Sequence, residues 1–313
     1  MSSNKFNPSL AAVALSLALA TQAEAQSSLG VRANGMGGAF VGVANDATAV
    51  YWNPAGLAIG ALASVNLEFG DLAPDGPGNP DSLRHALVGL ALPPVGIAYF
   101  RQGVFGTRPP GPAATGSDSR EPLRSKVHSF STSTLAVSLL QSVTEYVVVS
   151  ATPKLLWGGE SFTADVDASA MLAVQRFRLG LVGRNLATPS FAVDDSGAAD
   201  VALDRQLRLG GGWGSGWPGH SRVVVAVDGD LMNRDTLSGD RRDVAAGVET
   251  WWMDRRFGLR GGMRGSTVGD PRAVVSAGAS AQMAGMFLEG YVAGGDAGER
   301  SWGLGLRYSF YED

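Results

Sequence analysis

The sequence predicts an all-β fold: a transmembrane antiparallel β-barrel of about fourteen strands, with an N-terminal hatch, or plug, inside its lumen. Three observations support this fold class. The chain begins with a segment typical of exported proteins, it continues in apolar–polar alternation, and the connections between the alternating stretches differ in length in a regular way. The stretches also have the length of about 9–11 residues that a tilted strand needs to cross a bilayer.

The composition excludes several other classes of protein. The chain of 313 residues has a mean hydropathy of +0.06 and no apolar run long enough for a membrane-spanning helix. It contains no Cys, so disulfide bridges and thiolate metal ligands are impossible. Its net charge of −4 argues against nucleic acid as a partner. A mean hydropathy near zero is compatible with a membrane protein whose apolar and polar residues alternate.

Residues 1–25 are predicted to be a signal peptide. Lys5 precedes an apolar run over 10–20 that is too short to span a bilayer as a helix. Ala23-Glu24-Ala25 then fits the small-x-small rule for cleavage, so the exported protein is expected to begin at Gln26.

Residues 26–60 are predicted to form the hatch. They are rich in Gly and Ala and lack strand alternation, and they are the only segment of suitable size outside the predicted strands. Barrels of about 8 strands are filled by their own side chains, whereas barrels of about 16–18 strands enclose an aqueous channel. A fourteen-stranded barrel is closer to the second group, so its lumen would be open unless something occupied it. Gly35, Gly37 and Gly38 are expected to allow tight turns and a close approach of the backbone to the barrel wall.

The second half of the hatch contains an Asn-Pro-Ala segment. Pro54 biases Asn53 toward an extended conformation, so Asn53, Pro54, Ala55 and Gly56 are predicted to form a turn. This turn either acts as a gate that moves or belongs to a plug that never moves, and the residues leave both possibilities open.

Residues 61–313 are predicted to form the barrel itself. Near the C-terminus, for example, Trp302, Leu304 and Leu306 alternate with small or polar residues, and such alternation is typical of strands. The predicted strands are 61–70, 83–92, 95–103, 127–140, 145–157, 161–175, 177–186, 201–213, 220–230, 243–253, 256–265, 272–282, 286–294 and 300–311.

The connections between these strands indicate how the barrel is oriented. Long connections follow the first, third, seventh and ninth predicted strands, and short ones follow the second, fourth, sixth and tenth. Long loops on one side and tight turns on the periplasmic side are typical of outer-membrane barrels. With an even number of strands, both termini are expected in the periplasm. The expected location is the cell outer membrane of a Gram-negative-type bacterium.

Aromatic residues lie near the predicted strand ends, where the interface girdles of barrels are found. They are Trp157, Trp213, Trp217, Trp251, Trp252, Trp302, Tyr308 and Phe310. The last strand also resembles the C-terminal signal of barrels that the outer-membrane assembly machinery folds, although three residues follow Phe310. Outer-membrane lipid and this assembly machinery are therefore expected partners.

Charged residues of both signs occupy predicted lumen-facing positions. We expect them to form an ion-pair network that braces barrel and hatch, and a polar lining of a conduit is the alternative. The residues expected in this network are Arg178, Arg208, Arg260, Arg264, Arg307, Asp228 and Glu249.

No catalytic residue, metal site or cofactor is predicted, and the protein is not expected to be an enzyme. His85, His128 and His220 fall in no zinc motif, and the nucleophile motif of hydrolases is absent. Asp228 and Asp230 could suggest a calcium loop, but the Gly and the terminal Glu that such a loop requires are missing.

The stretch from Arg32 to Ala58 carries a more specific resemblance. Its pieces 32–40, 45–47 and 51–57 closely resemble the N-terminal signature of the FadL-like and PorV-like outer-membrane proteins, of the outer membrane protein transport superfamily. The resemblance implies a fourteen-stranded barrel whose hatch carries the Asn-Pro-Ala segment. On the FadL-like side it implies a channel for passive uptake or export of hydrophobic small molecules. Such a molecule would bind inside the barrel and leave sideways, beside a distorted strand.

Two groups of residues are expected to serve this function. The predicted strand 95–103 is the expected place of distortion, because Pro93, Pro94, Gly96 and Gly103 lie in it or beside it. An apolar ligand pocket between hatch and wall is expected to draw on Phe40, Leu57, Phe100 and Phe287.

Two other functions compete with the channel. The PorV-like side of the resemblance implies a scaffold or shuttle of a type IX-style secretion system, with secretion-system proteins as partners. A structural barrel of unknown role is the third possibility. An apolar pocket between hatch and wall would favour the channel, and an exposed apolar groove on the outer loops would favour the scaffold.

Overall fold

A computed structural model of the chain describes residues 21–24, 28–73, 83–107, 127–159, 161–192, 201–216, 221–236, 239–269, 272–296 and 298–311. The predicted signal peptide, apart from 21–24, lies outside the described residues, as do Trp217, His220 and much of the long connections.

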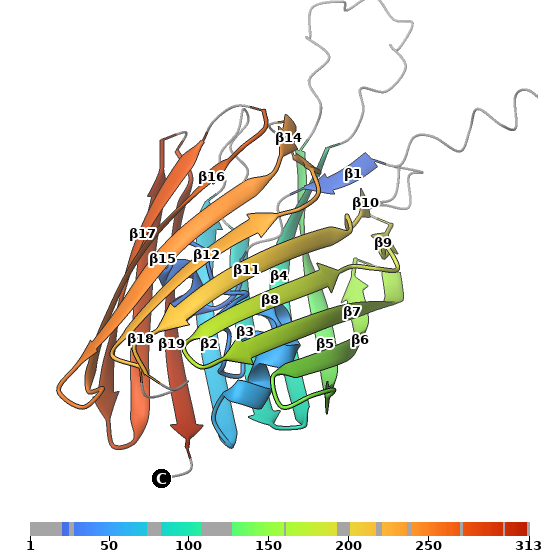
Figure 1. Cartoon of the computed structure of the whole chain (residues 1–313). Coiled ribbons are helices and arrows are strands. Elements are labelled where there is room, and N and C mark those ends of the chain that lie inside the picture. The colour runs from blue at the N-terminus through green and yellow to red at the C-terminus, as the bar shows by residue number, and fades with distance from the viewer. Residues whose placement is uncertain are drawn as a thin grey trace, which may run out of the picture.

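The described chain forms a closed antiparallel barrel of fourteen strands (Figure 1). The ring closes where the last strand pairs with the first, with Phe310 opposite Ala63. The strands are β2 (Ala63–Ala73), β3 (Leu83–Leu92), β4 (Val95–Thr107), β5 (Val127–Ser142), β6 (Val147–Gly158), β7 (Ser161–Val174), β8 (Phe177–Arg184), β11 (Gln206–Gly214), β12 (Val223–Asp230), β15 (Asp243–Trp252), β16 (Phe257–Ser266), β17 (Ala273–Met283), β18 (Met286–Gly295) and β19 (Arg300–Phe310).

The fourteen predicted strands are thereby confirmed, with one change. The predicted strand 201–213 is split into β10 (Val201–Ala202) and β11, and β10 pairs with β9 (Ser190–Phe191) instead of continuing the wall. Val201 and Leu203 are buried against Phe191. The chain therefore leaves the wall here because these apolar side chains pack in the interior.

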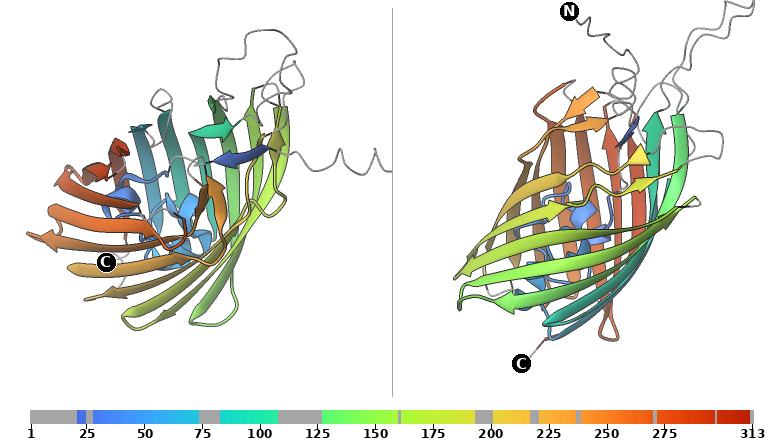
Figure 2. Two further views of the ribbon diagram at one scale, coloured as in Figure 1. Left: turned by 90° about the horizontal axis from the view of Figure 1, so that it is seen from above. Right: turned by 90° about the vertical axis from the view of Figure 1, so that its right-hand side faces the viewer.

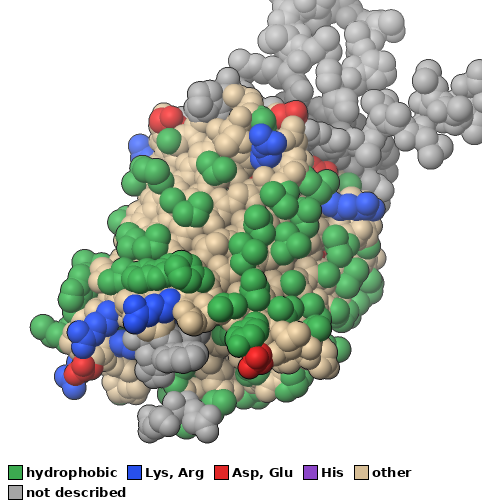
Figure 3. All heavy atoms as spheres, in the orientation of Figure 1, with side chains coloured by type: hydrophobic (Ala, Val, Ile, Leu, Met, Phe, Trp, Pro, Cys, Tyr) green, Lys and Arg blue, Asp and Glu red, His purple; other side chains and the backbone are tan. Residues whose placement is uncertain are grey.

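The polarity of the wall is the reverse of that in a soluble protein. Side chains alternate between its two faces, so that in β3 Val88 is 50% exposed while its neighbour Leu87 is 1% exposed. Inward positions include Asn66, Glu68 and Gln102, all buried. Figure 3 shows apolar side chains spread over the outer surface, with most charged ones toward its ends. An apolar exterior around a polar interior is the arrangement of a transmembrane barrel.

Most predicted girdle residues face outward, but Trp251 does not. Trp157, Trp252 and Trp302 are 37%, 46% and 43% exposed, whereas Trp251 is 2% exposed. The two adjacent tryptophans lie on opposite faces of β15 because strand side chains alternate. Trp251 packs inside against Phe287, with 5.4 Å between the ring centroids.

The two ends of the barrel differ in their connections. One end has tight turns, at 93–94, 143–146, 175–176, 253–256 and 284–285, and we call it the short-turn end. The other, the long-connection end, carries β9, β10 and the hairpin of β13 (Arg234–Thr236) and β14 (Gly239–Arg241). Ala63 and Phe310 both lie at the short-turn end, as an even strand number requires.

The N-terminal segment, residues 28–60, lies within the ring of strands (Figure 2). It contains the helices α2 (Val31–Gly35) and α3 (Ala49–Trp52) and the 3-10 helix η1 (Pro54–Ile59). Residues 29–57 are buried almost without exception, and α2 packs against β16–β19 while η1 packs against β5–β7. A further strand, β1 (Thr21–Glu24), lies at the long-connection end (Figure 1) and belongs to the predicted signal peptide.

In the part of the chain that the structure describes, no helix has both the length and the hydropathy to cross a membrane.

Candidate functional site

The predicted glycine turn lies where the N-terminal segment touches the wall. Gly37 and Gly38 have φ angles of 69° and 81°, a region that favours glycine. A Cβ on Gly37 would come within 2.5 Å of the backbone nitrogen of Met263. Gly35 instead ends α2, and a Cβ there would meet the Cα of Gly278 at 3.4 Å. Gly35 is thus a close-approach position and not part of the turn.

The Asn-Pro-Ala segment differs from the predicted turn. Asn53 is extended, with φ −162° and ψ 92°, as the proline predicts, but Pro54 then begins the 3-10 helix η1. Proline suits the first position of a helix because its missing N–H has no partner to lose there. Ala55 and Gly56 therefore belong to η1, where a Cβ on Gly56 would clash with the carbonyl oxygen of Ala44.

Few hydrogen bonds attach this part of the segment to the wall. The Asn53 Nδ2 donates to the carbonyl of Val41 at 2.9 Å within the segment and to the carbonyl of Ala170 in β7 at 3.3 Å. The backbone N–H of Ala55 donates to the Ser169 Oγ at 3.0 Å. No ion pair involves η1 among the described residues.

A chain of buried ion pairs fixes the first part of the segment. The Arg32 guanidinium contacts both carboxylate oxygens of Glu249 in β15, at 2.8 and 2.7 Å. Arg260 of β16 bridges Glu249 at 2.8 Å and Glu289 of β18 at 2.7 Å, and Arg307 of β19 contacts Glu289 at 3.0 Å. Five alternating charges therefore tie α2 to four strands.

Arg32 also pairs within its own segment. Its Nη1 contacts the Asp46 carboxylate at 3.1 Å. Burial by itself lowers the pKa of Arg32, but the carboxylates of Glu249 and Asp46 outweigh this and hold the pKa above its ordinary value. The Arg32 guanidinium therefore keeps its positive charge although it is buried.

The other predicted network residues are more dispersed. Arg208 contacts Asp228 at 3.5 Å and Asp230 at 2.9 Å, and Asp228 also accepts the backbone N–H groups of Phe40 and Val41. Arg264 pairs with Glu299. Arg178 is buried, but its Nη2 has no hydrogen-bond partner within the described ranges.

The structure brings together three of the four predicted pocket residues. Phe40, Leu57 and Phe100 belong to one buried cluster, which we call the central cluster. Phe287 lies apart from them, beside Trp251 and with the Arg307 guanidinium 4.2 Å from its ring centroid. Phe40 and Phe100 are joined through Trp52 and Tyr51, whose rings contact one another edge to face.

Two smaller apolar clusters flank the central cluster. At the long-connection end, Val104 and Leu156 pack with Phe191, Val201 and Leu203 in what we call the upper cluster. At the short-turn end, the lower cluster contains Ala55, Val148 and Met171, with Ile59 and Leu140 packed against it. Leu140 also packs against the central cluster. On β4 the central and upper clusters follow one another, with the buried Gln102 between Phe100 and Val104. On β6 the lower and upper clusters lie at opposite ends of the strand, separated by the buried Ser150, Thr152 and Lys154.

Strand β4 separates from β3 in its last part, at what we call the β3–β4 seam. Pairing of β3 with β4 covers Ala86–Leu92 and 95–101 and ends at Arg101, whereas pairing of β4 with β5 continues to Thr107. The seam lies in the strand whose distortion was expected. Leu83 packs onto Gly103, where a Cβ would clash with the leucine side chain.

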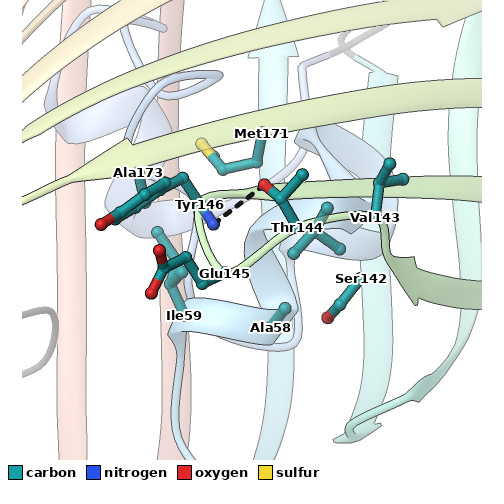
Figure 4. Close-up of a pocket in the computed structure, with 10 residues that line it drawn as sticks. Ala58, Ile59, Ser142, Val143, Thr144, Glu145, Tyr146, Met171 and Ala173 are labelled. Carbon is teal, nitrogen blue, oxygen red and sulfur yellow. Dashed lines mark hydrogen bonds between the residues drawn. The ribbon is translucent and has the colours of Figure 1, made fainter.

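A cavity of approximately 390 Å³ lies at the short-turn end, beside η1 (Figure 4). It is bounded by the end of η1, by the β5–β6 turn and by β7. None of the four predicted pocket residues lines it. Sequence reasoning could not find this cavity, because it depends on where η1 stops relative to the wall. In the described ranges, no group of three or more acidic or His side chains is placed to hold a metal ion.

No protein-family model and no curated protein sequence matches the chain. Solved structures do. The CymD monoaromatic hydrocarbon channel superposes with a TM-score of 0.66 at 12% identity, over 91% of this chain and 98% of that one. The Pseudomonas putida toluene transporter TodX superposes with a TM-score of 0.59 at 10% identity, over 90% of this chain and 96% of that one. The chain is therefore similar in fold to these channels over nearly its whole length.

Proposed function

We propose that this protein is an outer-membrane channel through which hydrophobic small molecules pass without an energy source. The observation that carries the proposal is the presence of three apolar clusters inside an otherwise polar lumen, one toward each end and one between them. A polar lumen would suffice for ions and sugars. Apolar clusters inside such a lumen can instead contact an apolar solute. The similarity to CymD and TodX, which are described as hydrocarbon or toluene channels, supports the same function.

The N-terminal segment is the hatch in this proposal. The clusters are packed, so passage requires part of the segment to move. Arg32 and its partners hold α2 firmly. Among the described residues, η1 donates one hydrogen bond to the wall, from Ala55, and Asn53 just before it donates another. Residues Ala58 to Gly60 are also partly exposed. We therefore assign the gate to η1 and the anchor to α2.

The β3–β4 seam supports an additional side opening. Val104 of the upper cluster and Phe100 of the central cluster lie on β4, on either side of the point where the pairing with β3 ends. A molecule bound between these clusters therefore lies beside a stretch of β4 that pairs with β5 but not with β3. Lipid lies outside it, since the exterior is apolar. In this proposal the short-turn end faces the periplasm, and the first strand begins and the last strand ends there.

Uptake of radiolabelled toluene tests the proposal. Cells that make the protein should take up toluene faster than cells that lack it. Val104→Asp, which places a carboxylate in the upper cluster, should reduce this rate about tenfold, because a buried charge there opposes an apolar solute. Val104→Ile keeps the surface apolar and should retain uptake. Folding of each variant is checked by the heat-dependent gel migration of intact barrels.

Two results would contradict the channel. One is toluene uptake that does not depend on the protein. The other is a secreted protein that co-purifies in stoichiometric amounts while no hydrophobic molecule does, which would favour a secretion scaffold.

A further inference from the structure

We propose that the cavity beside η1 is a binding site for a compact aromatic alcohol. The inference rests on the proposed function for its place in the passage, because a molecule that moves past the lower cluster toward the short-turn end meets this cavity next. Its volume of approximately 390 Å³ lies in the lower part of the range of about 300–1,000 Å³ that small-molecule sites occupy.

The back of the cavity is apolar. Val148 and Met171 of the lower cluster form it. Ile59 from the end of η1 and Ala173 from β7 line the same side, beside Met171 (Figure 4). Met171 is 1% exposed and Val148 9% exposed, so both present packed surfaces. A methionine and an isoleucine beside a small alanine can adapt to a flat ring. The apolar part of a ligand therefore belongs on this side.

The front of the cavity is polar and comes from the β5–β6 turn. The Thr144 Oγ1 accepts the backbone N–H groups of Tyr146 and Val147, at 3.2 and 3.0 Å, which fixes the turn and leaves the threonine hydroxyl hydrogen available. Glu145 follows in the same turn and lines the cavity (Figure 4). Glu145 is exposed, and among the described residues its carboxylate makes no hydrogen bond and no ion pair, so water and a ligand can both reach it.

The apolar back and the polar front of the cavity indicate which kind of ligand fits it. A free carboxylate at the rim of an apolar cavity disfavours an anion and favours a group that donates a hydrogen bond. Hydrogen bonds to a charged acceptor contribute more than those between neutral groups. A hydroxyl on a single aromatic ring would reach the rim while the ring contacts Ile59 and Met171. A hydrocarbon without a hydroxyl would leave the carboxylate hydrogen-bonded to water alone.

Photolabelling locates such a ligand directly. The probe is a benzyl alcohol that carries a trifluoromethyl diazirine on its ring, and a matching toluene with the same diazirine but no hydroxyl serves for comparison. Both are applied to the full-length exported protein in micelles, and labelled peptides are identified by mass spectrometry. The alcohol should label peptides that contain Ile59 and Met171.

Substitutions separate the cavity from the lipid-facing surface. Ala173→Phe and Ala58→Phe each fill the cavity from a different wall and should reduce alcohol labelling there about fivefold. Ala168→Phe is the control, since Ala168 lies on the outward face of the same strand as Ala173. Glu145→Gln should reduce labelling by the alcohol about tenfold, and it should leave labelling by the toluene probe unchanged.

The outcomes also separate this inference from the proposed function. If toluene uptake is normal but the lining peptides are unlabelled, or remain labelled in both filled variants, the binding site is wrong and the channel stands. If toluene uptake does not depend on the protein but the labelling behaves as expected, the channel is wrong and the site stands. Equal labelling by the alcohol in Glu145→Gln and in the unchanged protein would overturn the assignment to an alcohol.

Discussion

Arg32 is the residue that joins the N-terminal segment to the barrel. It contacts Glu249 through two parallel hydrogen bonds and Asp46 through a third, and all three side chains are buried. Only a guanidinium offers this planar pair of donors to a carboxylate. Its loss would leave Glu249 with Arg260 as its remaining cation. It would also leave α2 attached to a wall carboxylate through the backbone N–H of Val31, which donates to Glu68 at 2.8 Å.

Arg32→Met should therefore lower the free energy of unfolding by about 3 kcal/mol, because it leaves a buried carboxylate partly unpaired. Urea unfolding in micelles, followed by tryptophan fluorescence, measures this change. Arg256→Met, in the exposed turn between β15 and β16, is the matched control and should change little. Adding Glu249→Gln to Arg32→Met should recover part of the loss. Equal stability of Arg32→Met and the control would contradict the anchoring role.

Gly37 is the second residue on which the segment depends. Gly37→Ala combines a positive φ with a Cβ that would lie 2.5 Å from the Met263 nitrogen, so it should destabilise the protein by about 2 kcal/mol or more. Gly294→Ala is the control, since nothing lies within 4 Å of a Cβ there. Urea unfolding in micelles measures the stability of both variants. Equal unfolding midpoints for Gly37→Ala and Gly294→Ala would contradict the close approach of Gly37 to the backbone of Met263.

At the scale of single residues, the sequence predicted more of the backbone than of the contacts. The positive φ of Gly37 and Gly38 follows from local chemistry, so it could be expected. The partner of Arg32 could not, because Glu249 lies far away in the sequence. Glu289 was missed altogether, although its place in an alternating strand already indicates a lumen-facing carboxylate.

At the scale of elements, the strands were predictable because alternation is local and the lipid-facing side is uniformly apolar. The exceptions are places where tertiary packing decides. β10 leaves the wall to bury Val201, and Pro54 begins a helix where a turn was predicted. Alternation also indicates that Trp251 faces the lumen, because it lies two residues after the lumen-facing Glu249, although both tryptophans were expected in the girdle.

The end of the pairing between β3 and β4 leads to a prediction about the rates of backbone hydrogen exchange. Hydrogen exchange should be about tenfold faster in residues 102–107 of β4 than in 95–101, because the later residues lack β3 as a partner and local opening is easier there. β17 pairs on both sides along nearly its whole length and should exchange evenly. Mass spectrometry of proteolytic peptides measures both strands. Uniform protection along β4 would count against a side opening.

At the scale of the whole molecule, the lumen has two kinds of contents. Ion pairs that involve β15, β16, β18 and β19 fix the first part of the N-terminal segment. The apolar clusters include residues of β4 and β6, where Gln102 and Lys154 are buried between them. The near-zero mean hydropathy of the chain conceals both this division and the apolar exterior. Sequence alternation predicted the exterior, but the course of the clusters depends on how the segment is folded inside the ring.

The central claim is that hydrophobic molecules travel along these clusters inside the lumen. Crystals of the exported protein soaked with 4-bromotoluene test it most directly, because the anomalous signal of bromine marks where the molecule binds. The account predicts bromine inside the barrel, beside Phe100 of the central cluster or Val104 of the upper cluster. Bromine found solely on the lipid-facing exterior, with the lumen clusters unoccupied, would contradict it.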